Sequence, residues 1–91
     1  MSEREWRLVV APSADRVLAR LPQRPAEAIM EFMLGPLTEN PRRVGHPLRR
    51  ELEGLHSARR GAYRIIYEIV EETSEIRVLR IDQRADVYRP R

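Results

Sequence analysis

Three arginines around a glycine stand out as residues that could bind an anion. Arg59 and Arg60 precede Gly61, and Arg64 follows inside an apolar run with the pattern of a β-strand. Arginine is rarely buried in a strand without a partner, and its planar, permanently charged guanidinium suits phosphate oxygens. This spacing predicts a rigid strand and a basic turn that together hold a polyanion.

A second arginine and a tyrosine lie near the end of the chain. Arg84 ends the next apolar run, and Tyr88 follows four residues later. They add one candidate cation and one aromatic ring to the predicted anion site.

The charge distribution points to the same part of the chain. Seventeen arginines, with no lysine, face fourteen acidic residues and give a net charge of +3. Residues 42–64 carry seven arginines and two acids, whereas residues 1–41 and 65–91 each have a balance of −1. A localised basic patch favours an anionic partner through counterion release.

Length and composition limit the class of protein. We expect the 91 residues to form a single domain, 1–91, with a modest core, because a chain this short buries roughly 60–65% of its surface. The absence of cysteine excludes disulfides and suits a reducing compartment. The charged N-terminus does not resemble a signal peptide, and no window approaches the roughly 20 apolar residues of a membrane span. We therefore expect a cytoplasmic protein with no membrane partner.

The elements that must position these residues begin with a strand and two helices. Residues 6–11 are β-branched and apolar, and Ser13 is a plausible N-cap for a helix over 14–21. Pro25 suits the first position of a second helix, whose last turn Pro36 should loosen. The apolar stripe of that second helix consists of Ile29, Phe32, Met33 and Leu37.

The second half of the chain reads as three strands after a loop. The loop spans 38–50, and the strands are expected near 53–59, over 62–70 and over 76–82. Alternation places Arg64 on the face opposite Tyr63 and Tyr67. The order β-α-α-β-β-β predicts an α+β fold: a twisted, mostly antiparallel sheet, a helix hairpin on one face, and Arg64 on the other.

Two of these stretches resemble the RelE-type toxins of the RelE/ParE toxin–antitoxin superfamily. They are Gly-x-Tyr-Arg with two apolar residues and a tyrosine at 61–67, and Arg-x₃-Tyr at 84–88. The resemblance covers nearly the whole chain and implies a single RelE-like toxin domain. It also implies a ribosome-dependent mRNA endoribonuclease, in which the ribose 2′-hydroxyl attacks its neighbouring phosphate without a metal or cofactor.

The same resemblance implies a role for each candidate residue. Arg64 and Arg84 would stabilise the phosphate, and Tyr88 would stack or assist near the scissile bond. Arg59 and Arg60 would be general charges for the RNA backbone.

The residues alone leave other roles open. Arg64 could instead pair with Glu68 or Asp82 inside the sheet. Arg84 could be a solvated strand end, and Tyr88 could simply dock on the sheet.

Several residues are candidates for the group that moves the proton. Some relatives carry lysines near 55–57, where this chain has none, and many carry a histidine where this chain has Gln83. Gln83 can hydrogen-bond RNA but cannot transfer a proton, and arginine cannot be the base because its pKa is above about 12. The remaining candidates for proton transfer are His56, Glu53, Asp82 and Tyr88.

Partners and alternative functions follow from the resemblance as well. It implies a cognate RelB-like antitoxin, the ribosome and mRNA as partners, with operator DNA bound only through the antitoxin. Two histidines and no cysteine make a metal site improbable. The alternatives are a ParE-like gyrase inhibitor and a catalytically weakened toxin that still binds antitoxin and ribosome.

Overall fold

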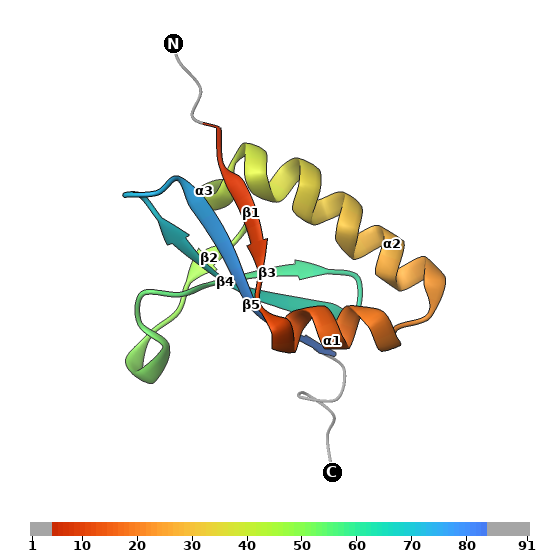
Figure 1. Ribbon diagram of the computed structural model, residues 1–91. Helices are drawn as coiled ribbons and strands as arrows, with labels where there is room; N and C mark the ends of the chain where they lie inside the picture. Colours follow the sequence, from red (N-terminus) through yellow and green to blue (C-terminus); the bar gives the residue numbers. More distant parts are fainter. Residues whose placement is uncertain (1–4, 84–91) are drawn as a thin grey trace.

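Five strands form one sheet in the computed structural model, which describes residues 5–83. The strand order is β1-β5-β4-β3-β2, with β1 parallel to β5 and the other neighbours antiparallel. The predicted α+β architecture is confirmed, and a two-residue strand adds to it (Figure 1). In chain order the elements are β1 (Arg7–Val10), α1 (Pro12–Arg20), α2 (Gln23–Phe32), the π-helical turn η1 (Met33–Leu37), α3 (Pro41–Val44), β2 (His46–Pro47), the 3₁₀ turn η2 (Arg50–Leu52), β3 (His56–Arg60), β4 (Tyr63–Val70) and β5 (Glu75–Gln83).

The first helix begins earlier than predicted. It starts at Pro12, whose fixed φ suits the first turn, and Ala11 occupies the N-cap position. Ser13 was therefore wrongly predicted as the cap. Its hydroxyl donates a hydrogen bond of 3.0 Å to the carbonyl of Leu79, which fastens α1 to β5.

The second helix ends in the loosened turn that its proline predicted. It begins at Gln23, so Pro25 is its third residue and not its first. Pro36 lies inside η1, where it has no N–H for the helical ladder. The hydroxyl of Thr38 donates to the carbonyl oxygens of Leu34 and Gly35 at 3.1 and 3.3 Å, which satisfies two acceptors of that turn.

The core lies between the helices and one face of the sheet. Alternation along β4 is confirmed, because Ile65 and Tyr67 are fully buried against the helices, with Tyr63 and Ile69 packed beside them. The other face of the sheet is here called the open face, although Ser57 and Ile66, which pair with each other there, are also buried. The buried core residues are Ala14, Ile29, Met33, Leu37, Ala58, Ile65, Tyr67, Ile76, Val78 and Ile81.

A bulge in β5 keeps its apolar residues on one side. Ile66 pairs with Arg80 and Tyr67 pairs with Val78, so Leu79 is an extra residue on β5. Without the bulge, strict alternation would place Val78 and Ile81 on opposite faces. Both are buried in the core, and Arg80 points to the open face instead.

The segment predicted as a loop over 38–50 contains α3 and β2. The Tyr67 hydroxyl donates a 2.5 Å hydrogen bond to the Pro41 carbonyl and holds this segment to the sheet. Gly45 lies so close that a Cβ there would meet the Tyr67 hydroxyl and lie 2.6 Å from the Ser57 carbonyl oxygen. A side chain at position 45 would therefore push the segment off β3.

Among the described residues, no helix is long and apolar enough to cross a membrane.

Candidate nucleic-acid interface

A tight turn between β3 and β4 brings two of the predicted arginines together. Gly61 adopts φ +62 as the first residue of a two-residue turn, a conformation that glycine adopts without strain. Arg60 therefore pairs with Tyr63, and Arg59 pairs directly with Arg64. Since side chains alternate, Arg59 and Arg64 project from the open face, whereas Arg60 and Tyr63 project toward the helices.

The Arg59–Arg64 pair, called the tip pair below, places two positive charges side by side. Directly opposed residues in an antiparallel sheet have Cβ atoms about 4.5–5.5 Å apart, and like charges there are destabilising. Arg59 is exposed, and Arg64 is partly buried, with its Nε covered. An anion bound between two such guanidinium groups would remove the repulsion and use their planar donors.

The neighbouring strand adds charges of both signs to this end of the open face. Asp82 pairs in register with Arg64, and Arg80 pairs with Ile66. Nη2 of Arg80 donates a 2.7 Å hydrogen bond to Oδ2 of Asp82. Three arginines and one carboxylate leave this end positive. Arg80 was not predicted as part of the site, because the bulge that turns it to the open face leaves no mark in the sequence.

Two of the predicted residues, Arg84 and Tyr88, lie outside the described residues. The described chain ends at Gln83, which is exposed and pairs with Tyr63. Gln83 therefore projects from the same side as Tyr63, away from the tip pair.

His56 is not brought to the tip pair. It is the first residue of β3 and pairs with Tyr67, so it projects to the helix side, and the two rings stack with centroids 5.5 Å apart. Burial first, then the charges of Arg42 and His46, lower the pKa of His56 below its ordinary value. Its Nδ1 is buried without a hydrogen-bond partner in the part of the chain that the structure describes. This environment fits a neutral packed ring.

The buried Tyr67 is equally unsuited to proton transfer at neutral pH. Burial raises the pKa of its phenol to about 12, so the hydroxyl stays protonated as the donor to Pro41.

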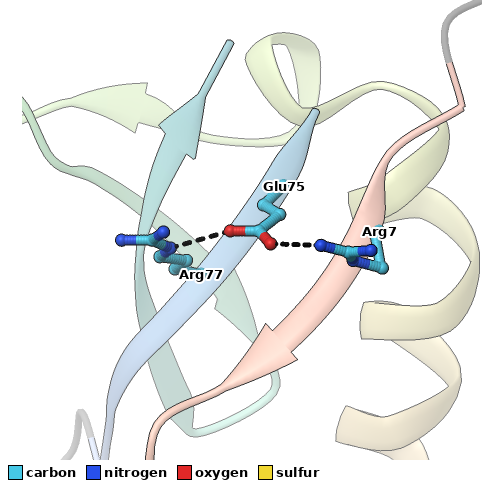
Figure 2. A network of polar contacts seen from close by, with 3 residues as sticks. All are labelled: Arg7, Glu75 and Arg77. Carbon is cyan, nitrogen blue, oxygen red and sulfur yellow. Dashed lines mark hydrogen bonds and ion pairs between the residues drawn. The ribbon is translucent and has the colours of Figure 1, made fainter. Parts of the chain in front are cut away.

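A second arginine cluster occupies the other end of the open face. Glu75 is a nearly buried carboxylate on β5, and Figure 2 shows it between Arg7 of β1 and Arg77 of its own strand. Nε of Arg77 donates to Glu75 at 3.0 Å, and Nη2 of Arg7 donates to its other oxygen. The hydrogen bond from Arg7, followed by that from Arg77, lowers the pKa of Glu75. Here the arginines already have a carboxylate partner within the fold.

Within residues 5–83 no group of three or more histidine and acidic side chains is arranged to hold a metal ion.

Comparison with known proteins assigns the chain to a family. Residues 8–88 match the family described as the ParE toxin of type II toxin–antitoxin systems. The toxin RelG of Mycobacterium tuberculosis is 52% identical over 85% of this chain and 88% of its own length. The chain is a RelE-type toxin of the RelE/ParE superfamily.

Further relatives of this toxin agree with the assignment. The toxin RelE of M. tuberculosis is 45% identical over 92% of this chain and 87% of its own length. A chain of the RelBE2 toxin–antitoxin complex from the same organism superposes with a TM-score of 0.84 at 45% identity, covering 88% of this chain and 99% of that chain. The Escherichia coli RelBE complex supports the fold alone, with a TM-score of 0.72 at 16% identity over 86% of this chain and 95% of that chain. The resemblance predicted from residues 61–67 and 84–88 is confirmed.

Proposed function

We propose that this toxin is a ribosome-dependent endoribonuclease that cleaves mRNA through attack of a ribose 2′-hydroxyl on the adjacent phosphate. The observation that carries the proposal is the tip pair: two arginines held in register on the open face, where a phosphate between them would relieve their repulsion. The similarity to toxins named RelE and RelG supports the same reaction class.

The reaction requires stabilised negative charge and a moving proton. Arg64, with Arg84, would stabilise the charge that develops on the phosphate, and Arg59 would hold the RNA backbone. Tyr88 would lie near the scissile bond.

Asp82 is better placed than His56 to accept the 2′-hydroxyl proton. It pairs in register with Arg64 on the same face, whereas His56 projects from the opposite face against Tyr67. The hydrogen bond from Arg80 keeps the Asp82 carboxylate oriented across the open face. Gln83 contributes hydrogen bonds at most.

A cognate RelB-like antitoxin is part of the proposal. The relative with 45% identity was solved as a toxin–antitoxin complex. An antitoxin segment that binds across Arg64 and Arg84 would mask their charge and block RNA, and the antitoxin would supply any contact with operator DNA.

The test is controlled expression in a bacterial host, with sequencing of RNA ends. We expect translation arrest, mRNA cut within translated codons, and cleavage by the Arg64→Ala variant that is lower by about 10²–10³-fold. Purified toxin should cut mRNA only when ribosomes are present. Intact mRNA both in the expressing cells and in the reaction of purified toxin with ribosomes would refute the endoribonuclease proposal.

A second candidate follows from the family description, which names ParE. A ParE-like toxin would act on DNA gyrase. The same expression experiment separates the two, because DNA damage and filamentation with intact mRNA would indicate a gyrase inhibitor. Growth without any phenotype would indicate a weakened toxin that only binds its partners.

A further inference from the structure

A short segment of the chain is attached to the edge of the sheet by few polar contacts. It comprises α3 and β2, residues 41–47, and is called the edge segment below. β2 pairs with only two residues of β3, and the ion pair between Arg42 and Glu71 is exposed, so it contributes little stability. The buried hydrogen bond from the Tyr67 hydroxyl to the Pro41 carbonyl adds a further contact. Local opening of such a segment requires less free energy than unfolding of the whole domain.

The edge segment fits the sheet too closely to shift by a small amount. A Cβ at Gly45 would meet the Tyr67 hydroxyl and would lie 2.6 Å from the main chain of β3. One end of the segment accepts the hydrogen bond from Tyr67 through Pro41, and at the other end Pro47 pairs with His56, whose ring stacks on Tyr67. Close packing of this kind favours two discrete positions, seated on the sheet and released from it.

The ring of His56 suits the seated position when it is neutral. A neutral imidazole has one nitrogen without a proton. The buried Nδ1, which has no hydrogen-bond partner among the described residues, fits that nitrogen. An imidazolium carries a proton on both nitrogens, so protonation would place a buried N–H at this position without an acceptor. The seated segment therefore disfavours the charged ring.

The groups that face His56 also oppose a positive charge on it. Burial, followed by the charges of Arg42 in α3 and His46 in β2, lowers the pKa of His56. Tyr67 of β4 stacks on the ring and stays neutral, because burial raises its pKa to about 12. The carboxylate of Glu71 is bound to Arg42. Since Arg42 and His46 both belong to the edge segment, its release would move these charges away and expose the ring to water.

We propose that protonation of His56 releases the edge segment from the sheet, which gives the toxin an acid-sensitive edge while the rest of the fold stays intact. Release would leave β3, which carries Arg59 of the tip pair, as the outermost strand of the sheet. Neither RNA nor a partner protein takes part in this change, so it does not depend on the proposed function.

The direction of the pH dependence follows from the two positions of the segment. When the segment is released, His56 has its ordinary pKa of 6.5, and when the segment is seated, the pKa of His56 is lower. The seated position is therefore most stable above pH 6.5, and it weakens as the pH falls from 6.5 towards the lower pKa.

Hydrogen exchange of the free toxin, measured at a series of pH values from about 7.5 to about 5, tests this proposal. The reporters are the amides of Arg43, Val44 and Leu48, which donate to the carbonyl oxygens of Asn40 and Leu55. After correction for the intrinsic exchange rate, their protection factors should fall below pH 6.5 by up to about tenfold per pH unit, as the uptake of one proton requires. The amides of β5 should keep their protection.

Two matched variants separate the two histidines of the chain. His56→Gln cannot titrate, so its protection factors should stay constant with pH, whereas His46→Gln should keep the fall seen in the parent. His56→Phe keeps an aromatic ring against Tyr67 without titrating, and it decides the outcome if glutamine alone loosens the edge segment.

Several results would overturn the acid-sensitive edge. They are constant protection in the parent, a fall of the same size in His56→Phe, loss of the fall in His46→Gln, and a parallel fall in β5, which would indicate unfolding of the whole domain. Reporter amides that exchange without protection at about pH 7.5 would show that the segment is not seated at all.

Discussion

The two ends of the open face carry the same residue type under opposite electrostatic conditions. At one end Arg59 and Arg64 face each other across β3 and β4. At the other end Arg7 and Arg77 share the carboxylate of Glu75. At the second end two arginines, one of them from β1, are bound to the carboxylate of Glu75. At the first end three arginines lie beside the single carboxylate of Asp82, and this positive excess favours an external anion. The number of arginines alone does not distinguish the two ends; the position of the carboxylates does.

We expect the largest effect on activity from Arg64→Ala, which tests the first end of the open face. Loss of one preorganised charge contact typically costs about 10²–10³ in rate, so ribosome-dependent cleavage should fall by that factor. A thermal melt must accompany the assay, because Arg64 is partly buried in β4 and its removal also costs the packing of its stem. Full activity in a folded variant would move the catalytic site away from the tip pair.

We expect a smaller effect from Arg59→Ala, which should weaken RNA binding. If Arg59 contacts a phosphate of single-stranded RNA, its removal should reduce the slope of log affinity against log salt by roughly 0.7. The measurement is a salt titration of toxin on programmed ribosomes or RNA. An unchanged slope would mean that Arg59 is a solvated charge.

Glu75→Gln sharpens the comparison from the other end. The pKa of Glu75 is lower in the folded protein than its ordinary value of 4.5. The ion pairs of Glu75 therefore stabilise the fold fully above pH 4.5, and this contribution is lost as the pH falls through the pKa of the folded state. The variant should melt at a lower temperature than the parent at neutral pH, and the difference should shrink on acidification. Melting curves from pH 7 downward test this, and a difference that stays constant with pH would contradict the assigned ion pairs.

Much of the fold followed from periodicity. Alternation along residues 62–70 correctly separated Arg64 from Tyr63 and Tyr67, because one buried face requires strict period-two placement. The bulge at Leu79 could not be predicted, since an inserted residue changes the facing of Arg80 without changing composition.

The candidate site was predictable only in part. The sequence placed Arg59 and Arg60 together, and only the register of the Gly61 turn shows that they project to opposite faces. His56 looked like a possible base by residue type, yet its pairing with Tyr67 turns it toward the helices. The face from which each of these side chains projects depends on the pairing register of the strands, which the residues next to it in the sequence do not reveal.

The central claim is that arginines at the two ends of the open face do different work. The most direct test measures cleavage on programmed ribosomes and thermal melting for Arg64→Ala and Arg77→Ala side by side. Arg77→Ala should lower the melting temperature and leave cleavage within about twofold, because a charge away from the reacting phosphate adds no transition-state stabilisation. Arg64→Ala should lose at least about a hundredfold in cleavage at a temperature where the melt shows that it is folded. Equal losses of cleavage in the two variants would contradict the account.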